Sequence, residues 1–205
     1  MRDAVGVIHG RFQILHLDHM KYLLEGKKRC DYLLIGISNP DMTTIKYVCA
    51  DPHRSESLAN PLTYYERFWM IRGAMLESGV SAEDFDIIPF PINRAELLGN
   101  YAPKDATYYM TIYDAWGLEK KRLLEDMGCA VDVMWQRPCT QKGISGTDVR
   151  NLIIADRPWA HLVPPFVYRY IVENRIDVRL REMYVANNDS ASERLKNKSI
   201  FENFD

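Results

Sequence analysis

Short apolar runs alternate with segments of helical spacing along most of the chain. Residues 4–8 are apolar and rich in β-branched side chains, which predicts a buried parallel strand. Residues 18–28 carry Met20, Leu23 and Leu24 at helical spacing, and residues 31–38 form a second strand-like run. The chain therefore begins with the order strand, helix, strand.

The same alternation continues toward the C-terminus. A helix is expected from about Thr63, because Tyr64, Phe68, Ile71 and Met75 form one apolar stripe. Further strands are expected at residues 86–91, 107–112 and 130–135, with a helix at 116–127 and another containing Phe166 and Ile171. Strands that alternate with helices indicate right-handed βαβ units and a parallel sheet. Ligands of such folds bind beyond the carboxyl ends of the strands, where the winding reverses.

Composition narrows the class of protein. With 205 residues and 47% hydrophobic residues, one globular domain is the default. Lys plus Arg is 26 and Asp plus Glu is 28, which argues against a protein that mainly grips nucleic acid. No apolar run is long enough for a membrane span, and the first residues lead directly into a strand, so no signal peptide is expected. Four scattered cysteines without a CxxC pair indicate reduced thiols, so a cytoplasmic protein is expected.

The segment between the first strand and the first helix holds the densest candidate chemistry. Gly10 and Arg11 are followed by His16 and His19, whose spacing lets both rings face one side near a helix start. Unpaired N–H groups and the helix dipole favour an anion there, and Arg11 adds a permanent charge. The pattern indicates a nucleoside-triphosphate site. The alternative is a glycine turn, an N-cap at Asp18 and two solvated histidines.

A second candidate segment, residues 142–150, follows the last strand. Ser145 and Thr147 can donate to phosphate oxygens, Gly146 permits close backbone approach, and Arg150 lies in the first turns of the expected helix. The alternative is an ordinary capping box formed by Ser145 and Asp148.

Residues 40–61 show little periodicity and contain three prolines. A loop of this length is either functional or simply solvated, and here it carries Lys46, His53 and Arg54. If the loop is functional, it would act as a flap that closes over the phosphates or the acceptor. At the helix start that follows, Thr63 and Glu66 fit a capping box, which leaves Arg67 as a candidate ligand contact.

Residues 10–19 resemble the HxGH motif of the nucleotidylyltransferase superfamily. Their Gly-Arg-Phe-Gln start is most similar to the archaeal-type nicotinamide mononucleotide (NMN) adenylyltransferases and their cytidylyltransferase-like relatives. Residues 145–150 resemble the family's Ser-Gly-Thr-x-x-Arg motif, and residues 61–67 its Pro-Phe-Thr-x-x-Glu-Arg element. The resemblance covers about residues 4 to 175.

This resemblance implies a Rossmann-like α/β fold. A five-stranded parallel sheet in the order 3-2-1-4-5 is expected, with helices on both faces and a C-terminal helical extension. Residues 1–184 would form the nucleotidylyltransferase domain, and residues 185–205 a polar C-terminal tail that is either mobile or a loose helix.

The resemblance also implies transfer of a nucleoside monophosphate from a triphosphate, ATP or CTP, to a small phosphorylated acceptor, with release of pyrophosphate and with Mg²⁺ as cofactor. The catalytic residues implied are Arg11, His16, His19 and Arg150. The nucleotide would contact Gly10, Phe12, Gln13, Ser145, Gly146 and Thr147. Candidates for the acceptor are Asn39, Arg54, Arg67 and Arg94.

Three departures from the family pattern affect the metal and the acceptor. Asp18 replaces a glycine, and it either binds Mg²⁺ or turns outward as an N-cap. Residues 93–96 lack the tryptophan of the Asn-x-x-Trp element, and residues 111–114 replace Ser-Gly-Asn-Pro. ATP and NMN are the first expectation, and CTP with a small phosphate or phosphonate is the alternative. Two further alternatives for the function are a non-catalytic nucleotide sensor and an aminoacyl-tRNA synthetase fragment. The protein could form a homo-oligomer. No nucleic-acid or membrane partner is expected.

Overall fold

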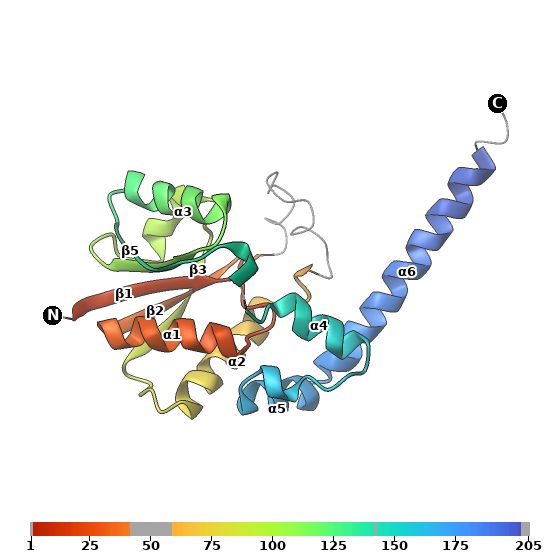
Figure 1. The fold of residues 1–205 in the computed structure, drawn as a ribbon, viewed down its shortest axis with the longest axis horizontal. Coiled ribbons are helices and arrows are strands. Elements are labelled where there is room, and N and C mark those ends of the chain that lie inside the picture. Colours follow the sequence, from red (N-terminus) through yellow and green to blue (C-terminus); the bar gives the residue numbers. More distant parts are fainter. Residues whose placement is uncertain (1, 42–58, 142, 202–205) are drawn as a thin grey trace.

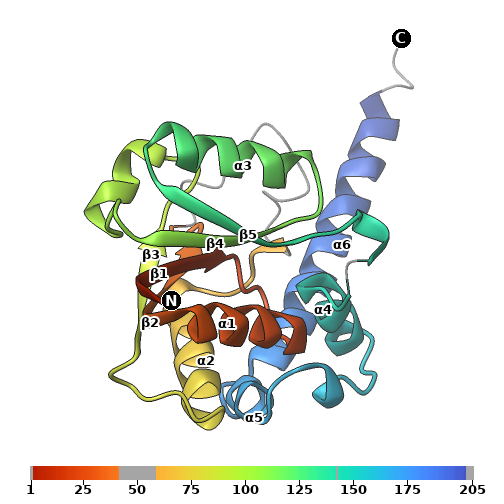
Figure 2. The same cartoon turned by 60° about the vertical axis from the view of Figure 1, so that its left-hand side comes forward.

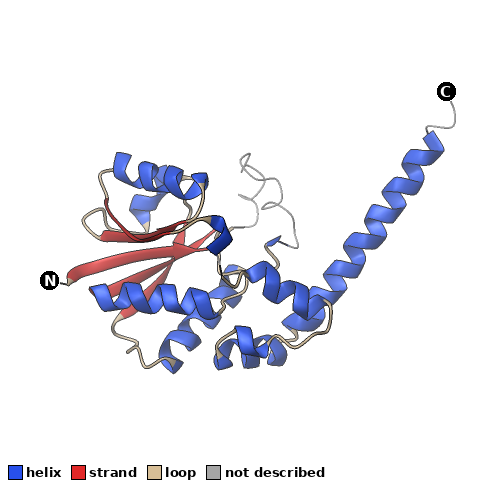
Figure 3. Cartoon of the chain, viewed as in Figure 1, coloured by secondary structure: helices blue, strands red, loops and turns tan. Residues whose placement is uncertain are grey.

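The computed structural model of the chain describes residues 2–41, 59–141 and 143–201. Strands and helices alternate until the last strand, after which the chain is helical (Figures 1 and 3). In chain order the main elements are β1 (Asp3–Gly10), α1 (Leu17–Arg29), β2 (Cys30–Ser38), α2 (Tyr64–Glu77), β3 (Phe85–Phe90), β4 (Thr107–Ile112), α3 (Ala115–Asp126), β5 (Ala130–Gln136), α4 (Gly146–Ile154), α5 (Pro165–Glu173) and α6 (Ile176–Phe201).

The five strands form one parallel sheet in the order β3-β2-β1-β4-β5. Val7 of β1 pairs with Leu34 of β2 on one side and with Tyr108 of β4 on the other. The expected Rossmann-like fold and strand order are thus confirmed. The winding reverses between β1 and β4, so a ligand site is expected where these two strands end.

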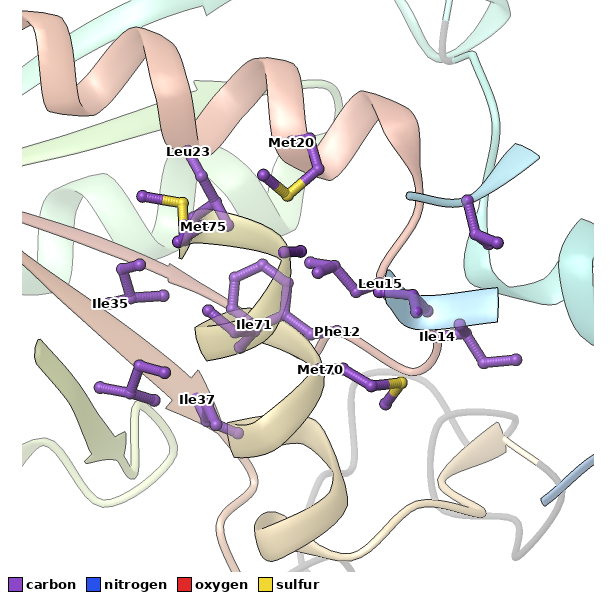
Figure 4. Close-up of a cluster of buried hydrophobic side chains, with 14 of the residues drawn as sticks. Phe12, Ile14, Leu15, Met20, Leu23, Ile35, Ile37, Met70, Ile71 and Met75 are labelled. Carbon is purple, nitrogen blue, oxygen red and sulfur yellow. The ribbon is translucent and has the colours of Figure 1, made fainter. Parts of the chain in front are cut away.

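Helices cover both faces of this sheet (Figure 2). Successive side chains of a strand point to opposite faces, and Ile8 and Val7 accordingly belong to different apolar clusters. Ile8 packs with Leu23 of α1 and Ile71 of α2, in the cluster that Figure 4 shows in part. Val7 packs on the other face with Leu124 of α3. The two clusters hold the strand ends rigidly in place.

Local sequence explains where the helices begin. Thr63 and Glu66 form the expected capping box at the start of α2, and Asp114 caps α3 by accepting a hydrogen bond from the Gly117 N–H. A 3-10 helix, Ala95–Asn100, follows β3.

The C-terminal helix α6 extends from the body of the protein in Figure 1. It passes the expected boundary between residues 184 and 185 without a break, because residues 176–201 contain neither glycine nor proline. Among the described residues, Cys30 and Cys129 are buried free thiols, as expected. None of the described helices is both long and apolar enough to cross a membrane.

Candidate active site

A cleft of about 940 Å³ lies at the carboxyl ends of the strands. It is lined by the ends of β1, β2 and β4 and by the starts of α1, α3 and α4. Its size is in the range of sites that bind small ligands and cofactors. This is the position that the reversal of winding predicts.

His16 and His19 stand together in the cleft wall at the start of α1. His16 is the N-cap, and its Nδ1 accepts a hydrogen bond of 3.3 Å from the backbone N–H of His19. The two rings are stacked, with their centroids 3.7 Å apart. The spacing thus places both rings on one side, as expected. Because Nδ1 of His16 accepts, the proton of a neutral ring sits on Nε2, which can donate to an anion.

The expected N-cap at Asp18 is wrong. Asp18 is the second residue of α1, since His16 has the extended backbone and the accepting side chain of an N-cap. The Asp18 carboxylate instead joins two segments that are distant in sequence. Its Oδ2 accepts from the Ile144 N–H at 2.8 Å, and its Oδ1 accepts from the Lys21 Nζ at 2.8 Å.

The start of α4 forms the facing wall. Ser145 and Asp148 make a complete capping box, which confirms the capping role expected as the alternative to phosphate binding. Ser145 also lines the cleft, so the capping box does not exclude a contact with a ligand. Gly146 lies against the loop after β1: a Cβ atom there would come within 2.3 Å of the Gln13 carbonyl oxygen. Only glycine allows α4 to approach so closely.

Arg150 ties α4 to the same loop. Its guanidinium donates to the Gln13 carbonyl oxygen and, at 2.9 Å, to Thr147 Oγ1. Arg150 is buried, and both Arg150 and the partly buried Arg11 line the cleft. Burial, and then the charge of Arg11, lowers the pKa of Arg150 to about 10, so it remains a cation at neutral pH. Two guanidinium groups close enough to repel each other favour an anion in the space they share.

Arg67 lies outside the cleft in which the expected ligand contact would be made. It is 1% exposed, lies outside the cleft wall, and donates to backbone carbonyls of two strand ends: Arg11, Ser38 and Asn39. Burial lowers the pKa of Arg67 to about 10, so it stays charged. It is a positioning residue, because a guanidinium saturated by carbonyls holds the loops rather than an acceptor.

Two of the expected nucleotide contacts also serve the fold. Gln13 is buried, and its amide both donates to the Leu62 carbonyl and accepts from the Leu62 N–H. The Phe12 ring is in the apolar core and meets His19 edge-on at 5.0 Å. Both residues fix the loop that carries Arg11 and His16. Their side chains are therefore engaged within the protein, although both residues border the cleft.

The remaining acceptor candidates, Asn39, Arg94 and Arg54, differ in whether they line the cleft. Asn39 lines the cleft, and its Oδ1 accepts from Asn93 Nδ2 at 3.2 Å. Arg94 is exposed, pairs with Glu96 at the surface and does not line the cleft. Arg54 lies outside the described residues.

The geometry does not support a magnesium site built by the protein. Both carboxylate oxygens of Asp18 already accept hydrogen bonds, and the described residues contain no group of three His, Cys, Asp or Glu side chains that could hold a metal ion. Burial acts to raise the pKa of Asp18, but the bonds from Lys21 and Ile144 outweigh it, and the net pKa is lowered. These contacts make Asp18 a brace between α1 and α4.

In the part of the cleft nearest α3, the sequence indicated only the segment 111–114. There the wall includes His9, Tyr22, Tyr113, Asp114, Trp116 and Lys120. The six residues form no recognisable motif, because His9 and Tyr22 are distant in sequence from the segment 113–120 that holds the other four. The only signal was the altered segment 111–114, which sits at the end of β4 as expected for a ligand-facing segment.

Comparison with known proteins gives consistent results. Residues 7–152 match the family described as cytidylyltransferase-like. The phosphonoformate cytidylyltransferase of Streptomyces viridochromogenes is 49% identical over 178 residues, which cover 87% of this chain and 96% of that protein. The nicotinamide-nucleotide adenylyltransferase of Saccharolobus solfataricus is 30% identical over 183 residues, with 87% and 95% covered.

A solved structure supports the fold. A bifunctional NMN adenylyltransferase/ADP ribose pyrophosphatase from Francisella tularensis superposes with a TM-score of 0.60 at 14% identity. The match covers 96% of this chain and 56% of that one.

Proposed function

Because this chain belongs to the cytidylyltransferase-like family, we propose that it transfers the cytidylyl group of CTP to a small acceptor that carries a phosphonate or phosphate. That it is a nucleotidyltransferase follows from the family and its relatives. The observation that carries the proposal is the joining of two anion-binding helix starts, those of α1 and α4, in one cleft. The 49% identity to a phosphonoformate cytidylyltransferase supports the choice of CTP and of a small acceptor.

The reaction needs positioning and charge stabilisation more than proton transfer. An ionised acceptor oxygen attacks the α-phosphorus of CTP, a new P–O bond forms, and the bond from the α-phosphorus to the bridging oxygen breaks. Pyrophosphate leaves with the electron pair. No general base is required, because the attacking oxygen is already ionised at pH 7.

The residues of the cleft suit these demands. His16 and His19 supply imidazole donors at the start of α1, and the N–H groups of α4 together with Ser145 supply donors opposite them. Arg11 and Arg150 would stabilise charge on the α-phosphate and on the leaving pyrophosphate. Such preorganised donors act on the transition state without having to reorganise.

A magnesium requirement stays a prediction. Mg²⁺ commonly keeps most of its ligands as water and substrate phosphate oxygens, so a triphosphate can carry its own ion into a site that offers no carboxylate cage.

NMN adenylyltransferase activity is the second candidate. Relatives of that name match over more than nine-tenths of their length, at 30% and 31% identity in Saccharolobus solfataricus and Pyrococcus furiosus. The altered segments 93–96 and 111–114 lie beside or within the cleft, however, and they disfavour the same acceptor here.

The deciding experiment is a crossed assay of pyrophosphate release in the presence of Mg²⁺. CTP and ATP are each tested with phosphonoformate and with NMN, and EDTA tests the metal requirement. We expect release with CTP and phosphonoformate. Release with ATP and NMN alone would instead establish the dinucleotide-forming activity. Binding of a triphosphate by calorimetry, with no release under any combination, would favour the nucleotide sensor. A cytoplasmic location and a homo-oligomeric state stay predictions.

A further inference from the structure

His9, the residue before Gly10, borders the cleft but has no part in the reaction described above. It is 7% exposed. Its Nδ1 is buried and has no hydrogen-bond partner among the residues that the structure describes. Buried polar nitrogens in proteins nearly always have a partner, so an unsatisfied one in a cleft wall points to a partner that is not part of the chain.

The orientation of the His9 ring is fixed by a contact that spans a whole strand. The ring stacks on Phe90 of β3 with centroids 4.6 Å apart and an interplanar angle of 16°. Between them lies Gly36 of β2, where a Cβ atom would come within 2.7 Å of Phe90. The absence of a side chain at Gly36 lets Phe90 lie over β2 and hold the imidazole. A polar group locked by packing is preorganised for recognition.

The charge around His9 indicates what kind of group it faces. Like Val7, His9 points to the α3 side of the sheet, and Lys120 of α3 lines the same cleft. Burial, and then the charge of Lys120, lowers the pKa of His9 to about 3. The imidazole is therefore neutral at physiological pH and can donate one hydrogen bond. A neutral nucleobase gains little from a lysine, whereas an anionic group is stabilised by it.

Distance restricts the ligand to a small molecule. His9 and Arg11 are separated by one residue, so their Cα atoms are at most about 7 Å apart. Asn39 and Asn93, which are joined by a hydrogen bond of 3.2 Å, line the same cleft. His9 and Arg11 therefore border the same part of the chain in the cleft wall, where a ligand of a few atoms can lie beside both.

We propose that the acceptor carries a second anionic group besides its reacting phosphonate or phosphate, and that the His9 imidazole and the Lys120 ammonium recognise this group. The inference rests on the proposed function and extends it by naming the residues that select an acceptor with two anionic groups, of which phosphonocarboxylates are the simplest examples. His9 and Lys120 determine specificity and are not assigned contacts with the reacting atoms.

Two pairs of variants test the proposal. His9→Phe keeps a ring that can stack on Phe90 but removes the polar atoms, and His9→Gln restores an amide. Lys120→Met removes the charge in the cleft, and Lys121→Met is its matched control, because Lys121 pairs with Glu125 and does not line the cleft. Each variant is assayed for the KM of phosphonoformate and of CTP, and for inhibition by methylphosphonate, which lacks the carboxylate. Thermal unfolding checks that each variant folds.

His9→Phe and Lys120→Met are each expected to raise the KM of phosphonoformate roughly 10- to 100-fold, the loss typical of a hydrogen bond to a charged group. The KM of CTP and the inhibition by methylphosphonate should stay unchanged, His9→Gln should regain part of the loss, and Lys121→Met should behave as the parent enzyme. An unchanged KM of phosphonoformate in His9→Phe, or an equal rise for CTP, would overturn the proposal.

A measurement without turnover separates this inference from the proposed function. The imidazole ¹⁵N resonances of His9, assigned by their loss in His9→Phe, are followed while phosphonoformate or methylphosphonate is added. A shift with phosphonoformate alone supports recognition of the second anion even if CTP is not the nucleotide. No shift with either compound, in an enzyme that does release pyrophosphate from CTP and phosphonoformate, contradicts the role of His9 and leaves the proposed function standing.

Discussion

The starts of α2 and α4 are built alike but do different work. Each begins with a complete capping box, Thr63 with Glu66 in α2 and Ser145 with Asp148 in α4. Each then presents a buried arginine, Arg67 or Arg150, and each arginine donates to a backbone carbonyl of the loop after β1. Burial lowers the pKa of both guanidinium groups to about 10.

The two starts differ in what surrounds the arginine. Arg67 is enclosed by carbonyls of β2 and of the loop after β1 and lies outside the cleft, whereas Arg150 lines it together with Ser145 and Gly146. A capping box followed by an arginine therefore specifies how a helix attaches to the β1 loop. Whether that attachment is a brace or part of a ligand site depends on which side of the loop the helix occupies.

The largest effect should come from the arginine in the cleft. Arg150→Met is expected to lower kcat/KM by about 10³, because it removes a cation from the site where charge develops. Arg150→Lys keeps the charge and should recover part of the rate. Steady-state pyrophosphate release measures both. A loss below tenfold, in a variant with normal thermal stability, would place Arg150 with Arg67 among the braces.

Arg67→Met should show the opposite pattern. Carbonyls of Arg11, Ser38 and Asn39 would lose their donor, and the free energy of unfolding is expected to fall by about 3 kcal/mol. Urea denaturation measures this loss. The fraction that remains folded should keep its activity within about tenfold, since the side chain does not line the cleft. Unchanged stability with a greater loss of activity would make Arg67 a ligand contact.

Hydrophobic spacing was sufficient to predict the fold class but not the order of the strands. The alternation of apolar runs and helical stripes indicated parallel βαβ units, and the resemblance supplied the strand order that the structure confirms. The polar composition after residue 184 left open whether this segment is mobile or a loose helix, and α6 continues through it to Phe201. Helix formation by residues 185–201 depends on their helix propensity and not on apolar spacing.

The candidate site was predictable where motifs carry it. His16, Arg11, Ser145 and Arg150 lie on contiguous segments, so their spacing indicated a shared anion site. His9 could not be found in this way, because its partner Phe90 is far along the chain and reaches it only over Gly36. Contacts across several strands leave no local pattern in a sequence.

The close approach of α4 can be broken directly. Gly146→Ala places a Cβ atom within 2.3 Å of the Gln13 carbonyl oxygen, so α4 or the β1 loop must move. A shift of this size in a positioned site is expected to lower kcat/KM about 30- to 100-fold. Gly99→Ala is the control, because a Cβ atom there meets nothing within 4 Å. Equal activity of the two variants would show that the contact between α4 and the loop is not needed.

Asp18 joins the two walls of the cleft and gives a smaller, pH-dependent effect. Asp18→Asn weakens the bonds to Lys21 and to the Ile144 N–H, and should cost about 1 kcal/mol at pH 7. Because the folded pKa of Asp18 is lowered from 3.8, its contribution is fully present above that pH and is lost as the pH falls through the lower, folded-state value. Urea denaturation at pH 7 and near pH 3.5 should show the difference between parent and variant narrowing.

The same variant addresses the metal. If Asp18 is only a brace, Asp18→Asn leaves the Mg²⁺ concentration for half-maximal activity unchanged. A marked increase in that concentration would restore Asp18 as a metal ligand.

Arg94, which lies outside the cleft, extends the comparison between Arg67 and Arg150 to an exposed arginine. Its substitution is expected to have the smallest effect on activity and stability. Like Arg67, it was a candidate for the acceptor because of its charge and its place after a strand. Its guanidinium pairs with Glu96 at the surface, and the residue does not line the cleft. Exposed ion pairs contribute little to the free energy of unfolding, so Arg94→Ala should change that free energy by less than about 0.5 kcal/mol. The KM of phosphonoformate should change by less than about twofold. Asn93→Ala is the neighbouring control, because Asn93 lines the cleft and donates to Asn39. A tenfold rise in KM for Arg94→Ala, with no change for Asn93→Ala, would mean that the acceptor is bound beyond the cleft wall and that Arg94 turns inward when it binds.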